Sequence, residues 1–98
     1  MIHYNNNRPF VEGVSIEDIA KAQTTPFYVY SQTKITDTFE QLKNSLNSEI
    51  FYAVKANSNQ SIIKLMASLG AGADVVSVGE LERAVLAGVE PQKIIFEG

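Results

Sequence analysis

The sequence predicts an α/β fold in which helices alternate with the strands of a parallel sheet. Short apolar or β-branched runs recur about every twenty to twenty-four residues. Each run is followed by a segment whose apolar residues have helical spacing. Such intervals are too long for the loops of hairpins. They suit a connection through a helix, because two consecutive parallel strands must be joined by a crossover of that length.

The elements follow one another in a simple order. Residues 1–8 are polar and Asn-rich, and form either an edge strand or a mobile arm. Ser15 is expected to cap a short helix over 15–20 that ends before Thr25-Pro26. Strands are predicted at 27–30, 50–54, 74–76 and 93–96. The helices between them carry apolar stripes formed by Ile35, Phe39, Leu42 and Leu46, by Ile62, Leu65, Met66 and Leu69, and by Leu81, Ala84 and Val85.

Capping residues define the ends of these helices. The predicted N-caps are Ser31 or Thr33, Ser58 or Asn59, and Ser77, and the predicted stops are Gly70, Gly88 and Pro91. The tyrosines at 28, 30 and 52 alternate along strands and are interpreted as core residues with a polar tip. Periodicity alone leaves a doubly wound sheet and the start of a barrel equally open.

Lys55 is the most informative residue. It ends the apolar run 50–54 and precedes the turn-prone run 56–59, which places an amine at the carboxyl end of a buried strand. Partial desolvation there would favour a neutral, nucleophilic amine that can form an imine with a carbonyl group. The alternative is a lysine that extends from a strand end into solvent.

Three motifs resemble a known family. They are Phe51-Tyr52-Ala53-Val54-Lys55-Ala56-Asn57, Gly70-Ala71-Gly72-Ala73-Asp74-Val75-Val76-Ser77-Val78-Gly79-Glu80-Leu81, and Ile94-Ile95-Phe96-Glu97-Gly98. Together they resemble the diaminopimelate decarboxylases, which are alanine-racemase-like, fold-type III enzymes that use pyridoxal 5'-phosphate. The resemblance runs from about Pro26 to Gly98. Ornithine and arginine decarboxylases share the lysine motif, whereas the second motif favours the diaminopimelate branch.

The resemblance implies the first few βα units of a pyridoxal-phosphate-binding (β/α)8 TIM-like barrel. Such a barrel needs about 250 residues, and this chain has 98. We therefore expect an amino-terminal fragment, truncated before barrel closure and before a C-terminal β domain. Residues 1–25 would be an arm with a short helix, and residues 26–98 the start of the barrel. The isolated chain is expected to be inactive and incompletely packed.

The resemblance also assigns roles to individual residues. Lys55 would be the catalytic residue that holds the cofactor, with Asp74 and Ala53 beside the cofactor. Glu80 and Asn57 would lie near the site. Simpler structural roles stay open, because Asp74 can be an exposed strand start and the other two polar residues can be helix caps.

The function implied is decarboxylation of meso-2,6-diaminopimelate to L-lysine. The alternatives are another amino-acid decarboxylase of this fold, acting on ornithine or arginine, or a catalytically silent module that binds a subunit or the cofactor. The partners expected are a small amino-acid substrate and a second subunit in a homodimer. The remaining cofactor and substrate groups are expected beyond Gly98.

Composition excludes several other classes. The eight basic residues are scattered, which argues against a nucleic-acid surface. The absence of cysteine excludes disulfides and thiolate chemistry within these residues, and the single histidine has no ligand partner at metal spacing. The sequence has no signal-peptide core and no membrane-length apolar segment, so a cytoplasmic location is expected.

Overall fold

The computed structural model describes residues 2–97, so Met1 and Gly98, at the ends of the predicted ranges, lie outside the described residues. The chain divides into two compact units, the first ending at Thr38 and the second beginning at Phe39. The boundary predicted between residues 25 and 26 refers to a complete barrel and stays a prediction. The candidate site lies within the second unit.

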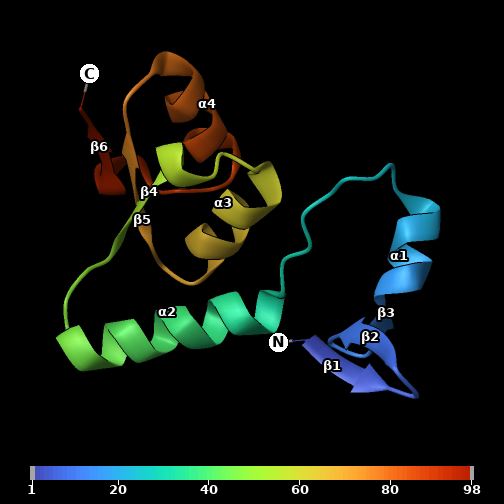
Figure 1. Ribbon diagram of the computed structural model, residues 1–98. Helices are drawn as coiled ribbons and strands as arrows, with labels where there is room; N and C mark the ends of the chain where they lie inside the picture. The colour runs from blue at the N-terminus through green and yellow to red at the C-terminus, as the bar shows by residue number, and fades with distance from the viewer. Residues whose placement is uncertain (1, 98) are drawn as a thin grey trace. The chain divides into compact units, whose positions relative to one another are not determined.

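The first unit begins with a small antiparallel sheet of strands β1 (Ile2–Asn5), β2 (Arg8–Val11) and β3 (Val14–Ser15), paired in that order (Figure 1). Asn6 and Asn7 have φ values of 52° and 61°, and Glu12 and Gly13 have 51° and 77°. Two-residue turns with positive φ match the twist of an antiparallel pair. Of the two interpretations of residues 1–8, the edge strand is therefore confirmed over Ile2–Asn5, and Asn6 and Asn7 form the turn that leads to β2.

Capping residues start both helices of the first half of the chain. Helix α1 (Ile16–Ala22) is capped by Ser15, as predicted. Helix α2 (Gln32–Leu46) is capped by Ser31, whose hydroxyl accepts a hydrogen bond of 3.1 Å from the Lys34 N–H. Thr33, the other candidate cap, instead donates its hydroxyl and its N–H to the Glu12 carboxylate. The hydroxyl hydrogen bond is the main reason why the pKa of Glu12 lies below its usual value.

The strand predicted at 27–30 is wrong. These residues have no regular secondary structure, and a cis peptide bond joins Thr25 to Pro26 just before them. Tyr28 is 88% exposed and Tyr30 is also exposed, so the interpretation of these two as core residues is wrong too. Their aromatic and β-branched composition favours extended backbone, but a strand also needs a hydrogen-bonded neighbour, and no ladder in the described residues includes them.

The second unit contains the predicted parallel sheet. Its strands β4 (Phe51–Ala53), β5 (Gly72–Val75) and β6 (Ile94–Phe96) lie in sequential order and are all parallel. Helices α3 (Gln60–Ser68) and α4 (Val78–Leu86) form the two crossovers, and they contact each other on one side of the sheet (Figure 1). Short 3₁₀ turns, η1 (Val54–Ala56) and η2 (Pro91–Lys93), follow β4 and precede β6.

The end of α3 shows why a glycine follows it. Gly70 has a φ of 94°, and its N–H donates to the Ala67 carbonyl while the Ala71 N–H donates to the Met66 carbonyl, both at 3.0 Å. This pair of hydrogen bonds satisfies carbonyls that the helix leaves open and turns the chain toward β5. Asn59, one of the two predicted caps, begins the same helix by accepting from the Ser61 N–H.

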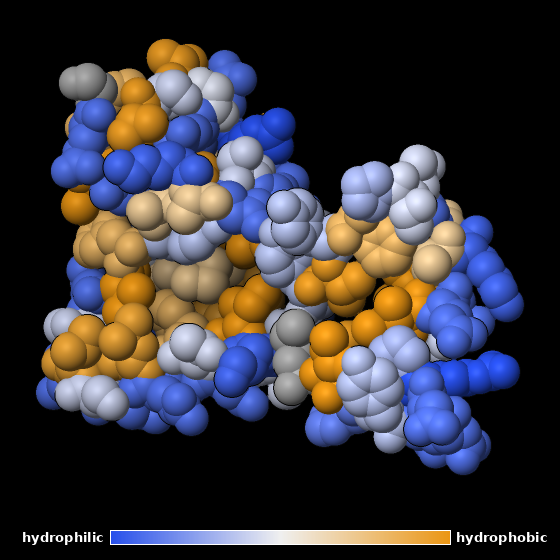
Figure 2. All heavy atoms as spheres, viewed as in Figure 1, coloured by the Kyte–Doolittle hydropathy of each residue, from blue (hydrophilic) through white to orange (hydrophobic). Residues whose placement is uncertain are grey.

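The two faces of the sheet differ in their cover. On the helix side, a core is formed by Val54, Ile63, Ala73, Val75, Ala84, Ala87 and Val89, with Tyr52, Ala67, Leu81 and Ile94 packed against it. The opposite face leaves the large apolar side chains of Phe51 and Ile95 exposed. Apolar side chains are also visible at the surface in Figure 2. The second unit is therefore a sheet with helices on one face and an open second face.

Gly72 allows β4, β5 and β6 to approach one another closely. A Cβ atom at this position would lie 2.6 Å from the Lys93 carbonyl oxygen and 2.5 Å from the Phe51 ring.

Gly72→Ala is expected to destabilise the whole protein by about 1–3 kcal/mol, because a backbone atom would have to move. Thermal unfolding should show a lower Tm than for Gly79→Ala, where the new Cβ meets only the Ser77 hydroxyl at 3.9 Å. Equal Tm values for the two variants would contradict this prediction.

Candidate active site

The carboxyl ends of the three parallel strands bring together one amine and two carboxyl groups. Lys55 lies in the turn that follows β4, Asp74 lies in β5, and Glu97 directly follows β6. The charges of Lys55 and Asp74 both act on the Glu97 carboxyl. Sites of α/β proteins are built at this edge of a parallel sheet. The structure therefore supports the carboxyl edge as the place for chemistry.

Asp74 is the central residue of this edge. It pairs in register with Ala53 on one side and Ile95 on the other, so these three side chains share one face of the sheet. That face is the open one, because the preceding and following residues of β5, Ala73 and Val75, point into the core. One carboxylate oxygen of Asp74, Oδ1, is buried and has no hydrogen-bond partner. A buried carboxylate oxygen without a partner is costly, so this atom is suited to accept a hydrogen bond from a bound group.

Lys55 is placed by the residue before it. Val54 is fully buried in the core, which fixes the start of the turn after β4. The Lys55 side chain itself is exposed. The expectation of a partly desolvated amine is therefore wrong within the second unit, where this side of the sheet has no covering layer. Desolvation of the amine would have to come from a bound group or from further chain.

Ala53 and Asp74 lie next to each other, since they are register partners on β4 and β5. The small side chain of Ala53 leaves space on the open face beside the unpartnered Asp74 oxygen. The adjacent Lys55 supplies a primary amine that can form an imine with an aldehyde. The cofactor-binding roles of the three residues stay predictions, but their chemistry fits a carbonyl-bearing cofactor held by an amine and by a carboxylate hydrogen bond.

Glu80 and Asn57, the two further candidates, have structural partners. The Glu80 carboxylate accepts from the Val76 N–H at 2.9 Å, while the Glu80 N–H donates to the Ser77 hydroxyl, so both help to start α4. The Asn57 side-chain oxygen accepts from the Asn59 N–H at 3.0 Å, which shapes the turn before α3. These hydrogen bonds account for both residue types at these positions. A role near the site stays a prediction for each.

Glu97 was not among the residues that the sequence singled out. Its pKa is raised, first by a hydrogen bond with the Asp74 side chain, then by repulsion from the Asp74 charge and by desolvation, while the Lys55 charge opposes the rise. A usable signal was present in the sequence, because Glu97 directly follows the predicted strand 93–96 as Lys55 follows the predicted strand 50–54. Parallel strands bring such residues to the same edge.

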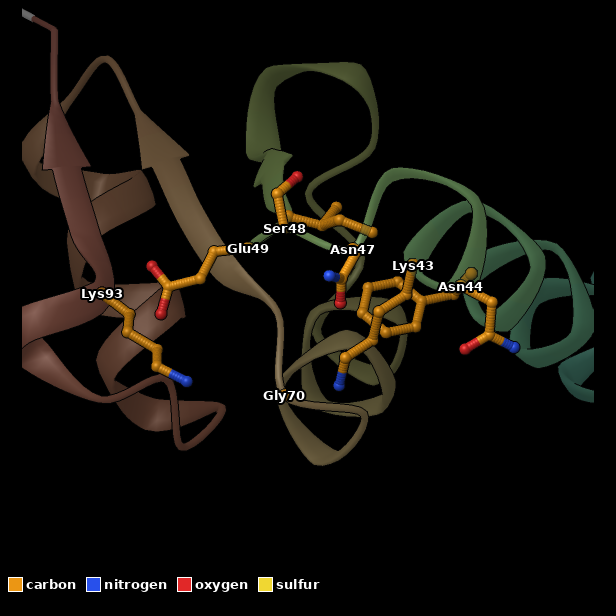
Figure 3. A pocket seen from close by; sticks show the side chains of 9 residues that line it. Lys43, Asn44, Asn47, Ser48, Glu49, Gly70 and Lys93 are labelled. Atoms are coloured by element: carbon orange, nitrogen blue, oxygen red, sulfur yellow. The ribbon is translucent and has the colours of Figure 1, made fainter.

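A separate open pocket lies at the other edge of the sheet. Its lining includes Ile50, Gly70 and Lys93, which come shortly before β4, β5 and β6 respectively. Figure 3 shows the side chains of Lys43 and Lys93 on either side of Gly70. This pocket is therefore distant from the amine and carboxyl groups of the carboxyl edge. This pocket does not include the reactive side chains of the carboxyl edge, and we assign the candidate site from those side chains.

Two further searches bear on the class of site. Residues 2–97 contain no group of three or more histidine, cysteine, aspartate or glutamate side chains placed to hold a metal ion. Among the helices described, none combines the length and the apolar character needed to cross a membrane. The candidate site thus consists of an amine, two carboxyl groups and an open sheet face.

Known proteins are similar to this chain in sequence and in fold. A family model described as the pyridoxal binding domain of pyridoxal-dependent decarboxylases matches residues 32–98. Diaminopimelate decarboxylase from Aquifex aeolicus (strain VF5) is 44% identical over 98 residues, which are 99% of this chain and 23% of that protein. A crystal structure of a protein from Aquifex aeolicus has a TM-score of 0.92 at 43% identity, covering 99% of this chain and 25% of that one.

A second activity occurs among the similar structures. The crystal structure of lysine decarboxylase from Selenomonas ruminantium has a TM-score of 0.77 at 34% identity, covering 89% of this chain and 23% of that one. The chain thus spans about a quarter of the length of the relatives that it matches. These matches confirm the predicted resemblance and the predicted barrel-type fold, since the residues matched lie in a pyridoxal binding domain.

Proposed function

The chain belongs to the pyridoxal-dependent decarboxylases, and we propose that the whole protein, the complete polypeptide that contains this chain, converts meso-diaminopimelate to L-lysine and carbon dioxide. The observation that carries the proposal is the placement of Lys55 in the turn that follows β4, two residues after Ala53, which is the register partner of Asp74 and its unpartnered oxygen on β5. The proposed substrate rests on the second motif, residues 70–81, and on the similarity to diaminopimelate decarboxylase from Aquifex aeolicus.

Pyridoxal phosphate supplies, when bound, an electron sink for the electron pair released as the substrate carboxylate leaves as carbon dioxide. The residues of this chain would hold and orient it. Lys55 would hold the cofactor aldehyde through its amine, on a turn that the buried Val54 fixes. Asp74 would accept a hydrogen bond at its unpartnered oxygen, and its negative charge would favour a protonated nitrogen nearby. Ala53 would leave room on the open face.

Product analysis of the whole protein tests this proposal. With pyridoxal phosphate and meso-diaminopimelate, we expect L-lysine and carbon dioxide in equal amounts, and neither product when the cofactor is removed. Isotope-labelled carboxyl groups would show which carbon is released. Lysine formation that does not require the cofactor would contradict the proposal. So would the absence of lysine from a protein that has bound the cofactor.

We further propose that the whole protein acts in the cytoplasm as a homodimer. The exposed apolar side chains on the open face of the β4–β6 sheet are expected to be covered inside the complete barrel, so the proposed dimer rests on the family resemblance alone. Light scattering of the purified whole protein should give a mass of two subunits, and a monomer mass at working concentration would contradict the dimer.

A further inference from the structure

Glu97 shares the open face of the sheet with Asp74. Asp74 pairs in register with Ile95, and Glu97 lies two residues after Ile95. The Glu97 N–H donates a hydrogen bond of 2.8 Å to the Val75 carbonyl, so the parallel ladder continues through this residue. Side chains two residues apart on a strand point to the same face. The backbone therefore directs the Glu97 carboxyl to the side on which Asp74 lies.

Two carboxyl groups then face one amine. Asp74 raises the pKa of Glu97 both by hydrogen bonding and by charge, and the Lys55 charge acts on Glu97 from the turn after β4. A hydrogen bond between two carboxyl groups requires that one of them carries a proton. When both are ionised, two like charges lie together, with Lys55 as the opposing charge in this interaction. The pair can therefore exist in two charge states beside the same amine.

We propose that Glu97 is a positioning residue of the cofactor site, acting on the Lys55 nitrogen through a carboxyl pair that it forms with Asp74. While the pair shares one proton, it presents a single negative charge and the two side chains are held together. Once the proton is released to solvent, the pair presents two negative charges. The second negative charge favours a protonated Lys55 nitrogen. This inference rests on the proposed function, in which Lys55 holds the cofactor.

The raised pKa of Glu97 supports the pair, since Asp74 causes that rise both by hydrogen bonding and by charge. The sign of the effect on Lys55 follows from simple electrostatics. Removing the Glu97 charge takes away one of two anions near the nitrogen. A nitrogen with fewer neighbouring anions loses its proton at lower pH. Glu97→Gln should therefore move the titration of the cofactor-linked nitrogen downward.

The absorbance of bound pyridoxal phosphate, followed against pH in the whole protein, measures that titration without any turnover. We expect its midpoint in Glu97→Gln to fall by about half a pH unit or more, the size of a charge interaction across a few ångströms of partly solvated space. Glu90→Gln is the matched control. It removes an exposed glutamate from the loop before β6, at the other end of the strand, and should leave the midpoint unchanged. An equal midpoint in wild type and Glu97→Gln would overturn the proposal.

A second measurement examines the pair without cofactor. Carbon-detected NMR of glutamate-labelled, cofactor-free protein should show Glu97 titrating at higher pH than exposed glutamates such as Glu90. In Asp74→Asn its titration should return toward that of Glu90, and an unchanged Glu97 titration would overturn the pairing. If borohydride reduction leaves no cofactor on Lys55 of the wild-type protein, the proposed function is contradicted. The titration of Glu97 in the cofactor-free protein still decides, independently of that result, whether the carboxyl pair exists.

Discussion

Replacing Lys55 by arginine in the whole protein is expected to abolish covalent attachment of pyridoxal phosphate and to lower kcat by at least about 10⁴-fold. Arginine keeps the positive charge and a similar length, but its guanidinium stays protonated and is a poor nucleophile. The substitution therefore separates the chemistry of the amine from its charge. Because Lys55 is exposed and follows a buried valine, the loss should occur without a change in stability.

Reduction with borohydride followed by peptide mapping identifies the lysine that is attached. Wild-type protein should carry the reduced adduct on Lys55 alone. Lys64→Arg is the matched control, since Lys64 is an exposed lysine on α3, and this variant should retain both adduct and activity. An adduct on Lys64 or on another lysine, with Lys55 unmodified, would refute the assignment.

The whole protein is expected to prefer meso-diaminopimelate over lysine, ornithine and arginine by up to about 10⁴-fold in kcat/KM. Diaminopimelate carries an amino and a carboxylate group at its distal end. A pocket built to pair with both groups is left with buried, unpaired polar atoms when a substrate lacks them, and that loss discriminates steeply. Val78 weakens this expectation slightly, because small residues such as glycine are common at this position of the resembled motif.

Steady-state kinetics with the four amino acids on one preparation would test this selectivity. Comparison at equal cofactor occupancy removes differences in loading. A preference for ornithine or arginine would move the protein to the polyamine-forming branch. A preference for lysine would make it resemble, in activity, the structurally similar lysine decarboxylase. Either outcome would leave the role of Lys55 intact, because attachment of the cofactor and recognition of the distal substrate end use different groups.

The elements of the second unit could be predicted from sequence because local signals and tertiary structure agree there. Three apolar runs became β4, β5 and β6, and Ser77 and Gly70 mark helix ends through hydrogen bonds with their own neighbours. Two residues of the candidate site could be predicted for the same reason. Lys55 and Asp74 lie at or near strand ends, and parallel pairing brings strand ends together whatever the loops between them do.

The errors arose where structure depends on a partner that the local sequence does not name. Residues 27–30 have strand composition, yet pairing requires a neighbour at the right distance, and composition says nothing about that neighbour. Strand β2 was missed because its residues lack a clear apolar alternation, while its turns rely on asparagine and glutamate at positive φ. Glu97 was overlooked although it directly follows a predicted strand, because its proximity to Asp74 depends on the pairing of β5 with β6, in which Asp74 lies opposite Ile95.

The sequential order of the parallel strands has a consequence for how the chain folds during synthesis. Each strand pairs with the one made just before it, and the crossover helix between the two is made before the second strand. Contacts of short sequence separation form quickly, since little loop-closure entropy is lost. As the ribosome releases the chain from the amino terminus, β5 can add to β4 before β6 has left the exit tunnel. Assembly of the sheet can therefore keep pace with translation, one βα unit at a time.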